Sequence, residues 1–122
     1  MDQQAIEAIL AQLKAPFGER AVSARTLPDG RIAFKILAVA LPPSCTPPRT
    51  SVWAVFSSQS AAPEIYVEQG IKVKGGIAPR NTYPETIEGE PVMRFSANLP
   101  YNPDLPLTEY IYGKLGRFTR AE

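Results

Sequence analysis

A single cysteine is the only residue of this chain that could act as a thiol nucleophile. Cys45 lies between two Pro-Pro pairs, at positions 42–43 and 47–48, which predict a stiff, extended loop around it. A reactive thiol needs a neighbouring base, cation or helix N-terminus that lowers its pKa. Arg49 is the only such group close to Cys45 in the sequence, so the pattern favours a spectator thiol packed under the loop over a catalytic nucleophile.

Two absences exclude most familiar catalytic and metal sites. The chain contains no histidine, which excludes Ser-His-Asp and Cys-His catalysis and histidine-ligated metals. One cysteine is too few for a structural zinc site. The sequence also has no glycine-rich phosphate loop and no carboxylate pair at a spacing typical of acid–base catalysis. We therefore expect neither a metal nor a cofactor.

Polar and aromatic residues of the turn-rich second half could contact a reacting group or a partner: Tyr83, Asn98, Tyr101 and Asn102. An asparagine amide can stabilise the oxyanion that forms when a carbonyl is attacked. Asparagine beside proline is more often a turn residue, because its side chain bonds to nearby backbone. The pattern favours turns at both asparagines, and Tyr83 and Asn102 are kept as candidate binding residues.

Lys72, Lys74 and Arg80, together with Arg94, could form a basic strip for an acidic partner. Residues 72 and 74 share one face if the backbone is extended. The alternative is a solvated sheet edge on which lysine blocks pairing with another strand, and this interpretation is the favoured one. Lys72, Lys74 and Arg80 are the candidate binding residues of this group.

Two aromatic residues are candidates for a contact surface. Trp53, the only tryptophan, lies in a strong strand pattern, which favours burial in the core over exposure to a partner. Tyr110 and Tyr112 are two positions apart in a predicted helix, so they cannot both face the core. We expect Tyr112 to be exposed and available for contact.

Length and charge limit the class of protein. A chain of 122 residues has the size of one domain, which we expect to span residues 1–122. The formal net charge of +1 argues against a nucleic-acid binder. No apolar run approaches the roughly 18 residues that a membrane-spanning helix needs, and from the polar N-terminus we expect no signal peptide. One cysteine fits a reducing compartment, so we expect a cytoplasmic protein.

Apolar spacing predicts a helix and four strands in the first half of the chain. The helix covers residues 2–14, with Asp2 as its N-cap and a firm end at residues 15–18. The strands are separated by turn signals and cover residues 21–27, 31–41, 50–57 and 64–68.

Two of these strands have predicted faces. Alternation in the second strand places on one face Ile32, Phe34, Ile36, Ala38 and Ala40. The third strand is apolar on both faces, with Trp53 and Val55 opposite a face formed by Val52, Ala54 and Phe56. Apolar residues on both faces indicate a central strand with a helix on one side only.

The second half is less regular. Residues 75–91 predict a long ordered segment that either is functional or hides short strands. A short strand at 92–95 and a last helix at about 105–118 follow, with Asp104 or Thr108 near the helix start. The apolar stripe of that helix consists of Leu107, Tyr110, Ile111, Leu115 and Phe118. The fold class is α+β: helix, antiparallel four-stranded meander, irregular segment, helix, with the helices on one sheet face.

Four local features accompany this order of elements. Pro42-Pro43 follows the second strand, Pro63 directly precedes the fourth, residues 89–93 read Gly-Glu-Pro-Val-Met, and residues 101–105 turn into the last helix. In order and proline placement, nearly the whole chain resembles the ubiquitin-conjugating fold, including its divergent bacterial and inactive variants. The resemblance implies that residues 89–93 correspond to the region of the family's catalytic cysteine.

The departures from the family concern its active site. The His-Pro-Asn triplet is absent, and Met93 or a neighbour occupies the position of the nucleophile. A thioether cannot form a thioester. The resemblance therefore implies a non-catalytic adaptor of a bacterial-type ubiquitin-like modification system, unless Cys45 carries the thioester. Its partners would be a ubiquitin-like protein and an activating enzyme. The alternative is a structural or assembly subunit, of a phage or a secretion machine, that acts through packing.

Overall fold

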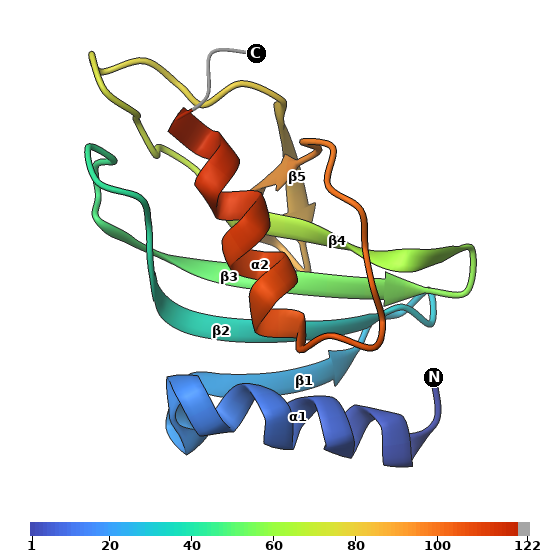
Figure 1. Cartoon of the computed structure of the whole chain (residues 1–122). Coiled ribbons are helices and arrows are strands. Elements are labelled where there is room, and N and C mark those ends of the chain that lie inside the picture. The colour runs from blue at the N-terminus through green and yellow to red at the C-terminus, as the bar shows by residue number, and fades with distance from the viewer. Residues whose placement is uncertain (120–122) are drawn as a thin grey trace.

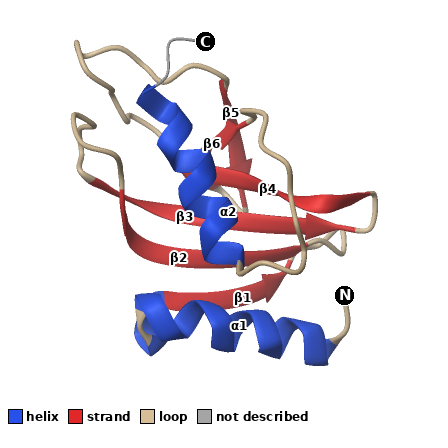
Figure 2. Ribbon diagram, in the orientation of Figure 1, coloured by secondary structure: helices blue, strands red, loops and turns tan. Residues whose placement is uncertain are grey.

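The computed structural model describes residues 1–119, which form an antiparallel sheet with two helices packed on it (Figures 1 and 2). In the first half these are α1 (Gln3–Phe17), η1 (Glu19–Ala21), β1 (Val22–Thr26), β2 (Ile32–Ala40), β3 (Arg49–Ser57) and β4 (Ser60–Glu68). In the second half they are β5 (Thr82–Ile87), β6 (Glu90–Phe95), α2 (Leu107–Leu115) and η2 (Gly116–Thr119). The α+β class is confirmed.

The sheet has six strands, not the predicted four, in the order β1-β2-β3-β4-β6-β5 with antiparallel neighbours throughout. The first four strands form the expected meander. Of the two strands beyond the meander, β6 confirms the short strand predicted at 92–95, whereas β5 comes from the segment predicted to be irregular. The two form a hairpin whose β6 pairs with the free edge of β4. The strand β5 escapes detection because it contains Pro84 and only one buried residue, Ile87, so it shows no apolar alternation.

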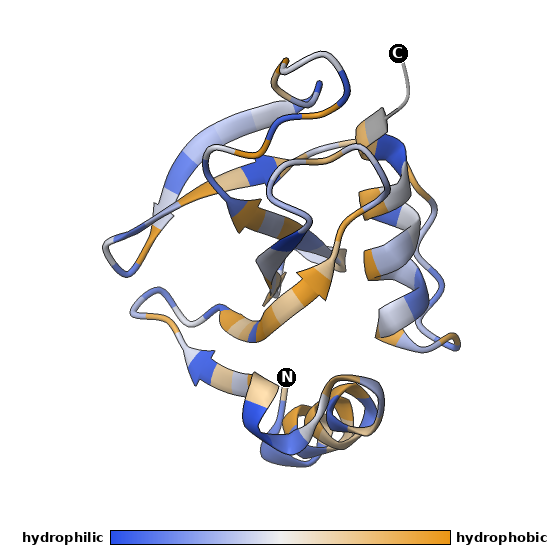
Figure 3. Cartoon of the chain, turned by 90° about the vertical axis from the view of Figure 1, so that its left-hand side faces the viewer, coloured by the Kyte–Doolittle hydropathy of each residue, from blue (hydrophilic) through white to orange (hydrophobic). Residues whose placement is uncertain are grey.

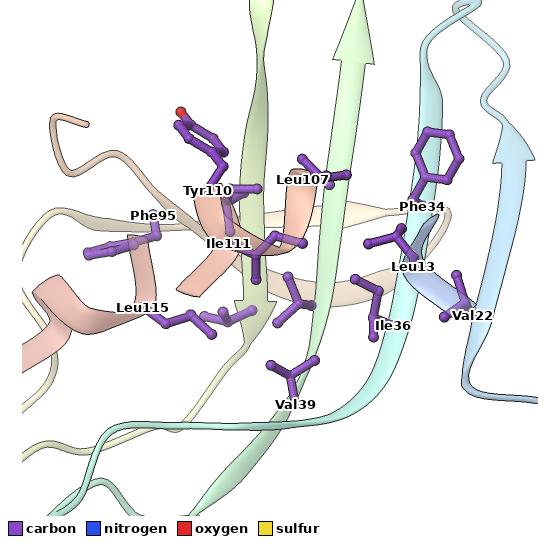
Figure 4. Close-up of a cluster of buried hydrophobic side chains, with 14 of the residues drawn as sticks. Leu13, Val22, Phe34, Ile36, Val39, Phe95, Leu107, Tyr110, Ile111 and Leu115 are labelled. Atoms are coloured by element: carbon purple, nitrogen blue, oxygen red, sulfur yellow. The ribbon is translucent and has the colours of Figure 1, made fainter. Parts of the chain in front are cut away.

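The main hydrophobic core lies between the helices and one face of the sheet (Figures 3 and 4). In Figure 3 the apolar side of α2 faces the strands, and Figure 4 shows Ile111 and Leu115 pointing toward Ile36 and Val39 of β2. The predicted stripe of the last helix is confirmed: all of its members are buried, namely Leu107, Tyr110, Ile111, Leu115 and Phe118. This core fixes the helices on the sheet.

A second, smaller core fills the opposite, concave face, which carries no helix. It comprises Leu27, Ala33, Trp53, Val55, Tyr66, Ile87 and Val92. The sheet curls so strongly that the β5–β6 turn reaches the opposite edge strand, where Arg25 Nη1 lies 2.9 Å from Glu88 Oε1. The prediction that β3 is a central strand with helices on one side only is confirmed.

The strand β2 departs from its predicted alternation. The register with β3 shifts between Ile36 and Val39, and Ala38 takes a positive φ of 57°. This β-bulge turns Val39 into the core, whereas Ala38 and Ala40 are exposed. The predicted face is therefore correct as far as Ile36 and wrong beyond it.

The ends of the helices are capped in different ways. Asp2 is the N-cap of α1 as predicted, and its carboxylate accepts a hydrogen bond from Ala5 N at 2.8 Å. Neither Asp104 nor Thr108 caps α2, so that expectation is wrong. Gln12 of α1 does so instead, because its Oε1 accepts from Leu107 N at 2.8 Å. The tertiary contact between the helices supplies the missing cap.

Candidate functional site

Cys45 is buried beneath the proline loop that joins β2 to β3. Its side chain is 7% exposed and belongs to the main core. Burial raises the pKa of the thiol, the opposite of what a nucleophile needs. The arrangement matches the favoured expectation of a spectator thiol.

The proline loop is tied to the segment that follows β4. The backbone of Thr46 exchanges two hydrogen bonds of 2.8 Å with that of Lys72. Beneath this bridge Cys45 and Ile71 are both buried. Residues 41–50 and residues 69–81 therefore form one anchored end of the molecule, although 26 positions separate Thr46 from Lys72 (Figure 1).

This end, which we call the cationic end, carries charge of one sign. Four of the thirteen lysines and arginines and none of the twelve acidic residues lie in residues 41–50 and 69–81: Arg49, Lys72, Lys74 and Arg80. All four are exposed. The predicted candidates Lys72, Lys74 and Arg80 thus lie in one segment. Neither Lys72 nor Lys74 makes an ion pair within the part of the chain that the structure describes.

The acidic residues that flank the cationic end are already bonded elsewhere. Glu68 Oε2 accepts a hydrogen bond from Ser51 N at 2.6 Å, and Glu85 Oε2 accepts from Arg94 Nε at 2.6 Å. Arg94 therefore belongs to the concave face, where it also stacks 5.0 Å from the centre of the Tyr83 ring. The expected strip of four cations is wrong in this respect: Arg94 is engaged in an internal pair on another face.

An exposed isoleucine lies at the tip of the cationic end. Ile77 is 62% exposed, the highest value among the large apolar side chains recorded as exposed. It closes a tight turn in which Val73 N donates to Ile77 O at 2.8 Å. Gly75 and Gly76 form that turn with φ values of 88° and 74°, which only glycine adopts without strain. Sequence reasoning missed Ile77, because one isoleucine in a turn-rich segment has no periodic pattern.

A small cavity of about 120 Å³ opens beside Lys72. Its lining is mostly apolar and includes Val67, Ile71, Ala78, Pro79 and Met93. Met93 therefore lies in a pocket wall, on the helix-bearing side of β6 with its pairing partner Val67. This pocket has no signal in the sequence, because β4, β6 and the loop that line it meet only in the folded chain.

The remaining candidates are spread over the molecule. Trp53 is 5% exposed in the concave core, so its predicted burial is confirmed. Tyr112 is 46% exposed on α2 as predicted, and its ring lies 6.0 Å from that of Phe17. Asn102 Oδ1 accepts from Asp104 N at 2.9 Å, which is the expected turn role, while Asn98 is exposed.

The concave face contains polar pairs that the sequence did not single out. Lys35 Nζ lies 3.2 Å from Glu90 Oε2 and 5.1 Å from the centre of the Trp53 ring. The hydroxyl of Tyr66 donates to Glu64 at 2.7 Å. Burial is the main cause that raises the pKa of Tyr66, and the hydrogen bond to the carboxylate raises it further. These groups are bonded to one another.

A cleft with a volume of about 720 Å³ lies between the β1–β2 turn and the β3–β4 turn. Charged groups in its wall include Glu64 and the ion pair between Arg31 and Asp29, whose closest atoms are 2.8 Å apart. No group of histidine, cysteine or carboxylate side chains that could hold a metal ion occurs among residues 1–119.

Comparison with known proteins adds no family to these observations. No protein-family model, curated protein or solved structure matches the chain. Within residues 1–119, no helix has the length and apolar character needed to cross a membrane.

Proposed function

We propose that this protein is a non-catalytic, protein-binding adaptor with an architecture like that of ubiquitin-conjugating proteins, working in a bacterial-type ubiquitin-like modification system. Its partners in that role are a ubiquitin-like protein and the activating enzyme. The observation that carries the non-catalytic assignment is the state of Cys45: the only thiol of the chain is buried, and burial raises its pKa.

The order of elements supports the proposed architecture. An N-terminal helix, four strands in meander order and a helix packed on the same sheet face all match the expectation from the resemblance. The β5–β6 hairpin departs from that expectation, since it extends the sheet beyond β4. The proposal therefore rests on the first four strands and the two helices.

The chemistry available to the protein supports binding over catalysis. The polar groups of the concave face are bonded to one another, as in the pairs Lys35–Glu90 and Arg94–Glu85. The cationic end offers charge and an exposed apolar side chain, which are features of a recognition surface. An adaptor needs only such a surface.

The test is recovery of partners with the tagged protein from its native host, analysed on gels with and without reductant. The matched variant is Cys45→Ala, which removes the thiol with little change in shape. We expect a stable ubiquitin-like protein or activating enzyme bound equally to both forms, with no reductant-sensitive adduct. An adduct that disappears in Cys45→Ala would instead make Cys45 a thioester carrier and the protein a conjugating enzyme.

The alternative function is that of a structural or assembly subunit. The dependence of molar mass on protein concentration distinguishes it from the adaptor. An adaptor keeps one molar mass as its concentration rises in light-scattering measurements, whereas an assembly subunit forms larger oligomers. Recovery of only itself or of structural subunits in the same experiment would replace the adaptor by the assembly function.

A further inference from the structure

We propose that the cationic end binds a short acidic segment of a partner protein, with one apolar side chain of that segment inserted in the pocket beside Lys72. This inference rests on the proposed role as a protein-binding protein, and it names the surface and the chemistry of the partner. It follows from three independent features of this end: the charges of Lys72 and Lys74, the pocket, and the rigidity of the backbone.

The charges indicate the sign of the partner. The rest of the chain carries twelve acidic residues and nine of the thirteen basic ones, whereas the cationic end carries four basic residues and no acid. The ammonium groups of Lys72 and Lys74 have no carboxylate partner among residues 1–119. Charge of one sign on a surface attracts a partner of the opposite sign and raises the rate of encounter. The complementary segment is therefore acidic.

The pocket indicates an apolar anchor within that segment. Its volume of about 120 Å³ suits a single side chain. The walls are formed by the apolar side chains of Val67, Ile71, Pro79 and Met93, and methionine adapts readily to the shape of a ligand. Glu68 also borders the pocket, but its carboxylate accepts the hydrogen bond from Ser51 N. Lys72 at the rim can therefore pair with a carboxylate next to the inserted side chain.

The rigidity of the surface keeps the cost of binding low. Lys72 is fixed by its two backbone bonds to Thr46, and Thr82 Oγ1 donates to Pro79 O at 2.9 Å. The turn that presents Ile77 is closed by the bond from Val73 N. A surface that is ordered before binding loses less conformational entropy when the partner docks. Ile77 then adds apolar contact beside the pocket.

The experiment is a fluorescence-anisotropy titration of the full chain with labelled acidic peptides that carry one central apolar residue, which is varied among leucine, methionine and phenylalanine. We expect binding that weakens as salt rises, because exposed ion pairs are screened. Replacement of the central residue by serine should weaken binding about tenfold, because the pocket loses its occupant.

Matched variants locate the site. Lys74→Glu and Arg20→Glu make the same change of charge at exposed positions, one on the cationic end and one on η1. We expect Lys74→Glu to weaken binding about fivefold or more and Arg20→Glu to change it less than twofold. Ala78→Phe, at an exposed position of the pocket wall, should block insertion of the apolar anchor. Unfolding midpoints close to that of the parent chain show that the variants fold.

Three outcomes would overturn the inference: no salt-sensitive binding of any of these peptides, equal losses in Lys74→Glu and Arg20→Glu, or unchanged affinity for the peptide with central serine. The same experiments distinguish a failure of the proposed adaptor function from a failure of the proposed binding surface. If the Lys74→Glu variant recovers the host partner as well as the parent chain does, the adaptor function is supported and the proposed binding surface is refuted. If the acidic peptides bind and no ubiquitin-like partner or activating enzyme is recovered, the binding surface is supported and the adaptor function is refuted.

Discussion

The concave face and the cationic end use charge in opposite ways. The four ion pairs recorded among residues 1–119 lie on or at the rim of the concave face, where they join Arg25 to Glu88, Arg31 to Asp29, Lys35 to Glu90 and Arg94 to Glu85. On the cationic end, Lys72 and Lys74 have no such partner within those residues. The charges of the concave face are neutralised within the chain, and the charges of Lys72 and Lys74 are available to attract another molecule.

Apolar side chains follow the same division. On the concave face the β5–β6 hairpin covers the aromatic ring of Trp53, so an apolar surface that no helix reaches is still protected from water. On the cationic end Ile77 remains exposed at the tip of a rigid turn. The hairpin therefore covers the concave face and leaves the cationic end exposed to solvent.

The largest expected effect is the loss of the concave core in Trp53→Ala. Removing a buried aromatic side chain leaves a cavity and should lower the free energy of unfolding by about 3–5 kcal/mol. Ile77→Ala on the cationic end should change it by less than about 0.5 kcal/mol, because exposed side chains contribute little. Urea unfolding followed by circular dichroism measures both. Similar costs for the two variants would refute the contrast between a covered and an open apolar surface.

Substitution and chemical labelling of Cys45 test whether the proline loop of the cationic end is rigid. Cys45→Ser places a hydroxyl where the thiol is buried and should destabilise the fold by about 1–3 kcal/mol. A thiol-specific reagent should label the native chain slowly and the urea-unfolded chain rapidly. Fast labelling of the native chain would mean that the proline loop opens, and the cationic end would not be a rigid surface.

The same thiol predicts a pH dependence. Its pKa is raised above the ordinary value by burial, so the thiol stabilises the folded state fully at pH values below the pKa of the unfolded chain. That stability is lost as the pH rises through the higher pKa of the folded state. Compared with Cys45→Ala, the parent chain should lose more stability between neutral pH and about pH 10. Parallel profiles of the two proteins would show that burial does not affect the thiol.

The ion pair between Lys35 and Glu90 should have a smaller effect. Both side chains are partly exposed, so a double-mutant cycle with Lys35→Ala and Glu90→Ala should give a coupling of about 0.2–1 kcal/mol that decreases in high salt. The emission of the sole tryptophan reports on the same contact, because Lys35 lies over its ring. A coupling insensitive to salt would mean that the pair is more buried than its exposure indicates.

The smallest expected effect is that of Lys74→Ala on stability. The side chain is exposed and has no ion-pair partner within residues 1–119, so the free energy of unfolding should stay within about 0.5 kcal/mol of the parent value. Thermal unfolding at low salt provides the measurement. A clear gain in stability would indicate repulsion among the cations of this end, and a clear loss would indicate an internal role for Lys74.

Much of the candidate site could be located in the sequence, though not assembled from it. Lys72, Lys74 and Arg80 are visible as cations in one segment, and the lack of activating groups around Cys45 other than Arg49 favours the spectator thiol that the structure buries. The pocket is not predictable, because its walls come from β4, from β6 and from residues 70–79, which the chain brings together only on folding. The exposure of Ile77 depends on the turn that carries it.

Local interactions between residues close in the chain account for the features that could be predicted from the sequence. The Asp2 cap, the buried stripe of α2 and the meander of β1 to β4 all arise from residues close in the chain, whose periodicity and turn propensities act before any distant contact forms. The tertiary structure alone decided the pairing of β6 with β4, the bulge in β2 and the cap that Gln12 gives to Leu107, 95 positions away. Those features depend on free hydrogen-bonding groups and apolar surface that meet only in the folded chain, where leaving them unpaired costs free energy.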